Sequence, residues 1–357
     1  GFDATADALH AGSLVQLRVI KTLVKHGHKA IVLLGGGTTK IGDPSGKDQS
    51  RQLLTSEEIQ QNIIGIRQVF DKYIKFGDGS SDAIQPNNAE WLENLNYVEF
   101  LRSYGRHFTI NRMLSFDSVR LRLEREQPLT FLEFNYMLLQ AYDFMELNKR
   151  FGCQLQMGGS DQWGNIVTGT ELIRRIGGGS AFAITTPLVQ KADGTKFGKT
   201  ESGNIWLDAK KTSPYKFYQY WINSSDSDAE NYIKIFTLFS KEKIEDLITE
   251  HKTNPGFRIL QNTLAKYITT MIHGEDQYLA AKEASSILFK KGNDAVIALK
   301  SLSKDVFLEI FEGVPQGKIN KDEVLKGMPI INALVESSGF LKSNGEARRA
   351  IGENSIL

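Results

Sequence analysis

The chain has 357 residues, of which 41% are hydrophobic and 24% are charged, and its formal net charge is +1. This length exceeds what one typical hydrophobic core organises, so two or three domains of ordinary globular composition are expected. A net charge this close to zero excludes binding of nucleic acid through an overall positive field. Any RNA-binding surface must therefore be a local patch.

Cysteine content and hydropathy further narrow the class of protein to which the chain can belong. The single cysteine, Cys153, excludes a disulfide framework, fits a reducing compartment, and is interpreted as a small buried apolar residue. No apolar run reaches the length of a membrane span, and no signal peptide is visible. The sequence starts at Gly1 inside a motif and stops abruptly after Leu357, so both ends are expected to be truncations.

Helix-like and strand-like patterns alternate in the first part of the chain. Residues 14–24 have apolar side chains at helical spacing, and residues 55–69 repeat this pattern behind a Thr-Ser-Glu-Glu capping sequence. Residues 30–34 form a short β-rich run closed by glycines, which predicts a buried parallel strand and a tight turn, and residues 155–159 repeat it. The alternation predicts an α/β fold with a doubly wound, Rossmann-like parallel sheet that binds ligands at the carboxyl ends of its strands.

The later part of the chain has helical periodicity throughout. Helices are predicted at residues 215–222, 229–239, 244–251, 259–273 and 277–289. A polar stretch at residues 317–322 is a candidate linker, and two short helices are predicted within residues 330–357. The pattern therefore predicts a helical second domain followed by a short third segment.

Two stretches carry groups suited to the phosphates of a nucleotide. A glycine-containing turn with His10 precedes the first helix, and a histidine with backbone N–H groups at a helix start can donate to developing negative charge. Lys196 and Lys199 lie in a glycine-containing loop, and lysines three residues apart can hold a triphosphate as point charges. Taken alone, a histidine at a helix start is more often a cap or packing residue, and the lysine loop is equally well explained as a solvated surface loop.

Three side chains at residues 136–143 suggest the wall of a polar pocket. Tyr136, Gln140 and Asp143 are spaced so that they share one face of a helix. A phenol, an amide and a carboxylate among apolar residues suit a pocket wall better than a core stripe, with a partly exposed helix face as the alternative.

Two other motifs are excluded by single residues. A phosphate-binding P-loop needs Ser or Thr after its lysine, but Asp48 follows Lys47, and Ile41 occupies the position of the earlier glycine. A hydrolase nucleophile elbow at Ser160 needs a glycine two residues later, where the chain has a glutamine. The first stretch instead supplies Asp43, a carboxylate near a strand end that can pair with an ammonium group.

The His10 turn and the lysine loop resemble the His-x-Gly-His and Lys-Met-Ser-Lys-Ser signatures of class I aminoacyl-tRNA synthetases. Essentially the whole chain resembles the bacterial-type tyrosyl-tRNA synthetases, with matching runs at residues 1–6, 41–47, 136–144, 158–165 and 193–200. The resemblance implies that tyrosine is activated with ATP to tyrosyl-adenylate and then transferred to tRNA(Tyr). Chemistry of this kind depends on positioning and charge stabilisation rather than on a protein nucleophile.

The resemblance implies four sets of functional residues. The catalytic set is His10, Ser13, Lys196 and Lys199. The tyrosine-binding set is Asp43, Tyr136, Gln140, Asp143, Gln156 and Gln162. The ATP-binding set is Gly1, Asp3, Thr5, His10, Gly12, Ser13, Gly159, Asp161, Gln162, Leu188, Val189, Lys196, Lys199 and Thr200. The tRNA-binding set is Lys47, Arg51, Arg348 and Arg349.

Within the tyrosine site, the resemblance assigns two binding roles. Asp43, Tyr136 and Gln140 hold the α-amino group, and Asp143 accepts a hydrogen bond from the phenolic hydroxyl. A second phenol partner, a tyrosine directly before Gly1, is expected but lies outside the sequence.

At the phosphate end, the chain departs from the signature at one position. Ser13 stands where the second histidine is usual; its hydroxyl can donate a hydrogen bond but carries no charge, so lower ATP affinity is expected. His10 is assigned to the transition-state phosphate, Lys199 to the triphosphate, Asp161 to the ribose, and Gln162 to the reacting carbonyl and phosphate.

The resemblance also implies domains and partners. Residues 1–212 are expected to form the catalytic domain with a connecting dimerisation segment, residues 213–317 an α-helical anticodon-recognition domain, and residues 318–357 a linker and the start of a small RNA-binding domain. A homodimer is expected, with Phe131 near the two-fold axis and Phe100, Phe108, Met113 and Leu114 supplying further apolar area. ATP with Mg²⁺ is the expected substrate, with no protein metal site, and the expected location is the bacterial cytoplasm or an organellar matrix.

Two alternatives stay open from the sequence. A tryptophanyl-tRNA synthetase shares the fold and both signatures, although Asp143 beside Tyr136 and Gln140 favours a phenol over an indole. An RNA-binding splicing scaffold of the same family would need a dedicated surface insertion, and none is recognised.

Overall fold

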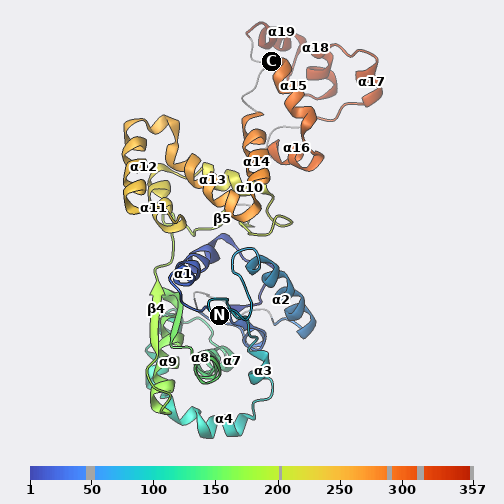
Figure 1. Ribbon diagram of the computed structural model, residues 1–357. Helices are drawn as coiled ribbons and strands as arrows, with labels where there is room; N and C mark the ends of the chain where they lie inside the picture. Colours follow the sequence, from blue (N-terminus) through green and yellow to red (C-terminus); the bar gives the residue numbers. More distant parts are fainter. Residues whose placement is uncertain (46–52, 201–202, 288–291, 312–316, 354–357) are drawn as a thin grey trace. The chain divides into compact units, whose positions relative to one another are not determined.

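The computed structural model describes residues 1–45, 53–200, 203–287, 292–311 and 317–353 (Figure 1). The chain divides into two compact units. The first consists of Gly1–Ser213 and Ser224–Leu264, and the second of Pro214–Asn223 and Ala265–Leu357. The predicted domain boundaries after residues 212 and 317 stay a prediction.

The strands of the first unit pair mainly in parallel. They are β1 (Phe2–Asp3), β2 (Leu34–Gly35), β3 (Leu155–Gly159), β4 (Phe182–Thr186), β5 (Lys199–Thr200) and β6 (Gly203–Asn204). β1 pairs in parallel with β2, and β3 with β4, whereas β5 and β6 form a short antiparallel pair. Parallel pairing of this kind requires the crossover connections that the alternating pattern predicted.

The predicted strand at residues 30–34 is only partly regular. Strand geometry is confined to β2, but Ile31 and Leu34 also form parallel bridges to Ile84 and Asn87. Val32 N–H donates to the Ile84 carbonyl at 2.9 Å, so backbone pairing extends along the predicted run. The predicted strand at residues 155–157 is confirmed and continues through Gly159.

The helices of the first unit surround these strands. They are α1 (Leu14–Lys25), α2 (Ser56–Phe70), α3 (Ala89–Leu92), α4 (Tyr97–Ser103), α5 (Ile110–Leu114), α6 (Asp117–Glu124), α7 (Phe131–Phe134), α8 (Tyr136–Phe151), α9 (Trp163–Arg175), α11 (Asp226–Phe236) and α12 (Lys241–Thr253). The predicted helix at residues 14–24 is confirmed as α1. The predicted helix at residues 55–69 is confirmed as α2, and the Thr55 and Glu58 side chains each accept a hydrogen bond from the other's backbone N–H.

The core of the first unit centres on α8 and α9, which pack side by side (Figure 1). Phe144 of α8 is fully buried, and a Cβ placed on Gly169 of α9 would lie 3.0 Å from its ring. The missing side chain therefore lets the two helices approach closely. Cys153 packs against this same core but is only partly buried, so the predicted burial is confirmed in part.

Two helix starts in the first unit differ from the prediction. The helix predicted at residues 229–239 begins at Asp226, where Ser225 Oγ accepts from Asp228 N–H, and it ends at Phe236. The helix predicted at residues 244–251 begins at Lys241, where Ser240 Oγ accepts from Lys243 N–H. Apolar periodicity missed both starts because a capped first turn consists of polar residues.

The second unit is helical. Its helices are α10 (Pro214–Ile222), α14 (Glu275–Ile287), α15 (Gly292–Ser301), α16 (Lys304–Ile310), α17 (Lys321–Leu325), α18 (Ile330–Asn332) and α19 (Asn344–Gly352), with a π-helical turn at Ala333–Ser337; α13 (Ile259–His273) runs across the division between the units. α10 packs on α14, where Gln219 Nε2 donates to Ser285 Oγ at 2.8 Å.

The helical predictions for this unit are largely confirmed. The helices predicted at residues 215–222 and 259–273 match α10 and α13. The helix predicted from residue 277 begins at Glu275, and α17 begins inside the polar stretch at residues 317–322, where Asn320 caps it. None of the helices in the described ranges combines the length and apolar character needed to cross a membrane.

Candidate active site

A cavity of about 1210 Å³ lies in the first unit and is lined by residues of β1, β2 and β3 and of the segments on either side of them. Most of the predicted tyrosine- and ATP-binding residues line it. They are Gly1, Asp3, Thr5, His10, Gly12, Ser13, Asp43, Tyr136, Gln140, Asp143, Gln156, Gly159, Asp161, Gln162, Leu188 and Lys199. Val189, Lys196 and Thr200 are not part of the lining, and Lys47 and Arg51 lie outside the described residues.

Asp143 forms the buried end of the cavity. It lies on α8 and is 2% exposed; Trp91 Nε1 donates to one carboxylate oxygen at 2.7 Å and Asn88 Nδ2 to the other at 2.8 Å. Burial raises the pKa of Asp143 to about 7, while the two donors act to lower it and the nearby Asp3 carboxylate adds to the increase. The carboxylate is therefore rigidly held in a site that penalises its charge.

Asn88 and Trp91 were not identified from the sequence. Both follow residues 84–87, whose backbone pairs in parallel with residues 31–34, so they lie where that paired segment ends. Polar groups at the carboxyl end of a parallel strand are the signal that could have found Asn88. Trp91 is indistinguishable in sequence from a core aromatic residue, and it is indeed 5% exposed.

A second layer stabilises the indole of Trp91. The guanidinium of Arg150, also on α8, lies 5.0 Å from the centre of the Trp91 ring. Arg150 Nε donates to the largely buried carboxylate of Glu146 at 2.6 Å. A cation over an indole face is an attractive electrostatic contact, so Arg150 orients the ring whose N–H holds Asp143.

Tyr136 is fixed by a carboxylate of β1. Its hydroxyl donates to Asp3 Oδ2 at 2.8 Å, and Thr38 Oγ1 donates to Asp3 Oδ1 at 2.7 Å. Asn88 Nδ2 in turn donates to Thr38 Oγ1 at 2.9 Å. Burial, followed by neighbouring carboxylates, raises the pKa of Tyr136 well above its ordinary value, so its phenol stays neutral.

Hydrogen bonds of amide side chains join the remaining residues of the predicted tyrosine site. Gln162 Nε2 donates to Asp43 Oδ2 at 2.8 Å, and Asn165 Nδ2 donates to Gln140 Oε1 at 2.9 Å and Gln162 Oε1 at 3.2 Å. Gln140 Nε2 contacts Gln156 Oε1 at 3.4 Å. The structure thus brings Asp43, Gln140, Gln156 and Gln162 together, and it adds Asn165, which sequence reasoning missed.

The His10 turn and the lysine loop meet directly. His10 Nδ1 accepts from Gly12 N–H at 3.0 Å and opens the turn Ala11–Ser13 that leads into α1. Gly198 has a left-handed φ of +77°, and a Cβ there would lie 3.3 Å from the Gly12 nitrogen. Ile205 links the two segments, because its N–H donates to the Gly198 carbonyl and its carbonyl accepts from Ala11 N–H.

The two lysines of the loop differ in position. Both are exposed, but Lys199 begins β5 and lines the cavity, whereas Lys196 pairs with Gln190 across a short turn outside the lining. This difference supports Lys199 as the residue nearer to a bound triphosphate.

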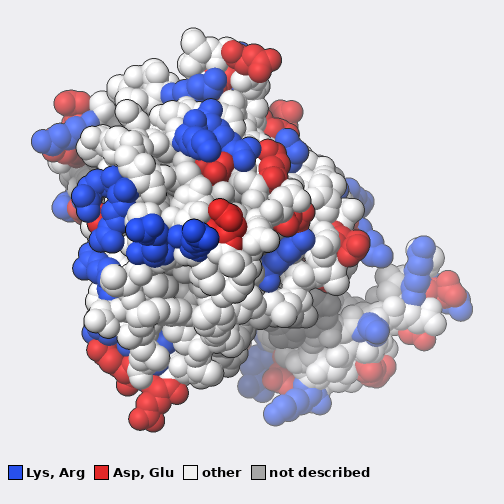
Figure 2. Space-filling view, turned by 90° about the horizontal axis from the view of Figure 1, so that it is seen from below, with Lys and Arg blue, Asp and Glu red and all other residues white. Residues whose placement is uncertain are grey.

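The other predicted residues lie on surfaces. Arg348 and Arg349 are exposed on α19 of the second unit, and Phe131, at the start of α7, is 71% exposed. Figure 2 shows lysine and arginine side chains in several groups on the near face with acidic residues among them, consistent with local patches. In the described part of the chain, no group of three His, Cys, Asp or Glu residues could hold a metal ion.

The prediction that a dimer surface includes Phe100 and Met113 is wrong. Phe100 and Met113 are 6% and 4% exposed and belong to the core cluster, and Phe108 packs against it. Phe100 and Met113 are covered within the unit and supply no apolar area to a partner, whereas Phe108 is only partly buried. Leu114 and Phe131 remain exposed.

Comparisons with known proteins agree with this geometry. A family model described as tRNA synthetases class I (W and Y) matches residues 1–290. A tyrosine–tRNA ligase from Flavobacterium psychrophilum is 52% identical over 360 residues, covering 100% of this chain and 83% of that protein. One from Bacteroides thetaiotaomicron is 49% identical over 98% of this chain and 82% of its own length. A truncated mitochondrial tyrosyl-tRNA synthetase from Aspergillus nidulans has a TM-score of 0.69 at 30% identity, over 81% of this chain and 84% of that one.

The chain belongs to the class I tRNA synthetase family of the tryptophan and tyrosine enzymes. It is an aminoacyl-tRNA synthetase with a Rossmann-like catalytic fold, as predicted. Within that family it groups with the bacterial tyrosine–tRNA ligases, which confirms the resemblance noted from the sequence.

Proposed function

We propose that the cavity forms tyrosyl-adenylate from L-tyrosine and ATP and passes the tyrosyl group to tRNA(Tyr). One observation carries this proposal: the His10 turn and the lysine loop pack directly on one another at a cavity whose buried end is the Asp143 carboxylate. Groups for phosphate and groups for a phenol thus line one space.

Recognition of tyrosine rests on the buried network. Asp143 accepts the phenolic hydrogen, and the α-ammonium group is held by Asp43, Tyr136 and Gln140, with Gln156 and Gln162 completing the wall. Phenylalanine would leave Asp143 with a desolvated lone pair, and an unsatisfied buried acceptor costs about 1–3 kcal/mol. Tryptophan would place an indole, instead of a phenol, against the single carboxylate of Asp143.

Activation of tyrosine is a displacement at the α-phosphorus of ATP. A tyrosine carboxylate oxygen forms the new bond, the bond to the β-phosphate breaks, and pyrophosphate leaves with its electron pair. Lys199 and His10 lie where they can stabilise the growing negative charge, and Ser13 donates a hydroxyl. Asp161 is assigned to the ribose, and a Cβ on Gly159 would lie 2.4 Å from its carboxylate, so a side chain at that position would displace the carboxylate.

Transfer completes the reaction. A ribose hydroxyl at the tRNA end attacks the tyrosyl carbonyl, and AMP departs with the oxygen that linked it. Thr5, which lines the cavity, is proposed to contact ATP together with Lys196, Thr200 and Val189, which lie outside the lining, and Mg²⁺ enters as part of the ATP substrate. Lys47, Arg51, Arg348 and Arg349 are proposed tRNA contacts, and the bacterial relatives support a bacterial cytoplasmic location.

The direct test is ATP–pyrophosphate exchange with tyrosine, tryptophan and phenylalanine, followed by charging of tRNA(Tyr). Exchange with tyrosine alone, together with tyrosyl-tRNA formation, is expected. Exchange with tryptophan would identify the sister specificity, and RNA binding without exchange would point to a scaffold protein; either result would overturn the proposal.

A homodimer around Phe131 is part of the proposal. The support is the exposure of an aromatic side chain at the start of α7, next to Leu132, which is 40% exposed. Phe131→Asp places two carboxylates opposite one another across a two-fold axis and should shift the protein to monomer. Light scattering at micromolar concentration measures this, and a monomeric wild type or an unchanged variant dimer contradicts the assignment.

A further inference from the structure

Phe197 is an apolar residue inside the otherwise exposed lysine loop. It stands between Lys196 and Gly198 and is only 8% exposed, although both loop lysines are exposed. Its ring stacks on Phe236 with centroids 5.1 Å apart and planes at 17°, and it meets the ring of Tyr232 edge-on, also at 5.1 Å. Tyr232 and Phe236 lie one turn apart on α11 and are together named the aromatic seat.

The seat and the His10 turn hold the loop from two sides. Phe197 packs into the seat, and the next residue, Gly198, lies against Gly12 and Ala11. Because Gly198 has a left-handed backbone, the chain turns sharply there and delivers Lys199 to the cavity. The position of Lys199 is therefore set by the two neighbours that lie directly before it.

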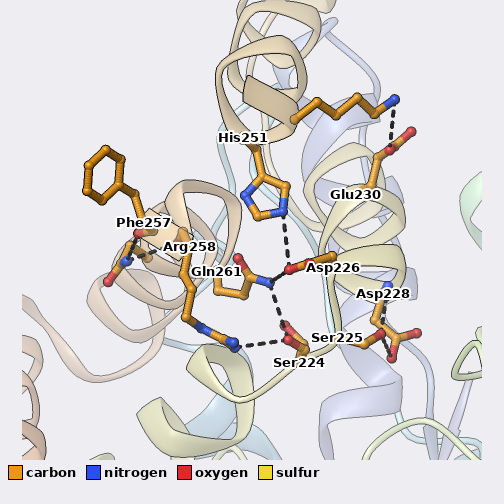
Figure 3. Close-up of polar contacts among 11 residues, drawn as sticks. Ser224, Ser225, Asp226, Asp228, Glu230, His251, Phe257, Arg258 and Gln261 are labelled. Carbon is orange, nitrogen blue, oxygen red and sulfur yellow. Dashed lines mark hydrogen bonds and ion pairs between the residues drawn. The ribbon is translucent and has the colours of Figure 1, made fainter. Parts of the chain in front are cut away.

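The N-terminal end of α11 is fixed by a polar cluster (Figure 3). Gln261 Nε2 donates to Asp226 Oδ1 at 2.6 Å, and His251 Nε2 lies 3.2 Å from the same oxygen. Arg258 and Gln261 also contact the Ser224 carbonyl. These contacts tie the first turn of α11 to α12 and to the start of α13.

The C-terminal end of α11 is fixed to α1. The guanidinium of Arg18, a buried residue of α1, donates to the carbonyl of Thr237, which follows the last residue of α11. The helix that begins at the His10 turn is therefore hydrogen-bonded to the helix that carries the seat. A movement of α11 relative to α1 would change the distance between the two signatures.

We propose that Tyr232 and Phe236 are positioning residues for adenylate formation, which hold Phe197 and thereby place Lys196 and Lys199 against the phosphates of ATP. This inference rests on the proposed function of the cavity. Neither seat residue lines the cavity, so their effect passes through Phe197. Long lysine side chains act on transition-state charge only when their backbone is held in place, and small displacements reduce rates strongly.

The test is a double-mutant cycle on the rate constant of adenylate formation. Phe197→Leu and Phe236→Leu should each lower this rate constant about 10- to 100-fold, with tyrosine affinity unchanged. The double variant should be no slower than the slower single variant, because both remove the same contact. Phe236→Tyr should keep the rate, since a stacked ring remains.

A matched control is Phe217→Leu in the second unit. Phe217 is as buried as Phe236 and also contacts aromatic rings, so the substitution removes similar packing. Its adenylate rate constant should equal that of the wild type. Additive effects of the two seat substitutions, equal losses of rate and tyrosine affinity, or a slow Phe217→Leu variant would each overturn the proposal.

Proteolysis supplies a readout that does not depend on activity. Trypsin cleavage after Lys196 and Lys199, followed by mass spectrometry of the native protein, should accelerate in Phe236→Leu but not in Phe217→Leu. Unchanged cleavage would show that the seat does not hold the loop. If the wild-type protein formed no adenylate, the proposed function would be wrong. The proteolysis rates would still show whether the aromatic seat holds the lysine loop.

Discussion

The two ends of the cavity, proposed above to bind the phenol of tyrosine and the phosphates of ATP and here called the phenol end and the phosphate end, are built in opposite ways. At the phenol end, Asp143 is 2% exposed, and each of its carboxylate oxygens accepts from a buried side chain. At the phosphate end, Lys199 and His10 are exposed; Lys199 directly follows the left-handed Gly198, and His10 caps the turn Ala11–Ser13. A buried network discriminates because any mismatched ligand leaves a polar group unpaired, whereas an exposed charge serves a transition state and still lets product leave.

The phosphate end is expected to give the largest effect. Lys199→Ala removes a cation that acts on charge growing in the transition state, so the rate constant of adenylate formation should fall about 10²- to 10³-fold with tyrosine affinity unchanged. Rapid-quench kinetics and equilibrium dialysis measure the two quantities. Equal losses in both would mean that the loop is structural and that the contrast between the ends is wrong.

The phenol end should show the reverse pattern. Asp143→Ala leaves the N–H groups of Asn88 and Trp91 without their acceptor, and one unsatisfied buried group costs about 1–3 kcal/mol. Tyrosine activation should fall about 10- to 100-fold, and selectivity against phenylalanine should fall with it. Exchange assays with both amino acids decide the point; full selectivity in the variant would remove Asp143 from the phenol site.

The buried carboxylate should also give a pH signature. Burial raises the pKa of Asp143 from its ordinary value of 3.8 to about 7, so the folded protein keeps a proton there that the unfolded chain loses. Its contribution to stability therefore falls as the pH rises between those two values and is level above them. Asp143→Asn should remove this slope.

Urea unfolding of the wild type and of Asp143→Asn between these two pH values gives the free energy of unfolding of each protein. The difference between the two isolates Asp143, because the contributions of the other carboxylates cancel. Tyrosine affinity should rise as the pH passes about 7, because Asp143 ionises there in the folded protein and the ionised carboxylate is the better acceptor of the phenolic hydrogen. Parallel pH profiles for wild type and variant would show that Asp143 does not titrate there.

The smallest effect is expected for Arg150, which contacts Trp91 and does not line the cavity itself. Arg150→Leu removes the cation over the Trp91 ring, a contact worth about 0.5–1 kcal/mol at a partly exposed site. KM for tyrosine should rise about two- to fivefold, while the adenylate rate constant stays constant, and Arg150→Lys should lie between. A change in the rate constant instead would mean that the two ends are coupled.

The sequence alone indicated the ligand-bearing segments of both ends. The spacing of Tyr136, Gln140 and Asp143 placed them on one helix face, and the structure puts all three in the lining of one cavity. Helix cores and the capping box of α2 were also predictable, because they depend on neighbours a few residues apart. Whether the predicted site residues act as assigned stays a prediction.

Supporting residues could not be predicted in this way. Trp91, Arg150 and the aromatic seat look in sequence like ordinary core or surface residues, and the roles proposed for them follow from contacts across 35 to 59 positions of chain. Phe100 and Met113 were expected at a dimer surface for the same reason, since apolar character does not tell which neighbour covers a side chain.

The sequence by itself determined the fold class, the helix periodicities, and the residue types proposed to bind phosphate and phenol, because these depend on local pattern and on side-chain chemistry. Only the tertiary structure decided that Gly198 packs on Gly12, that Asp143 is held by two buried donors, and that α11 holds the lysine loop. Burial and long-range contact are properties of the packed chain, and they set the pKa of Asp143 and the place of Lys199.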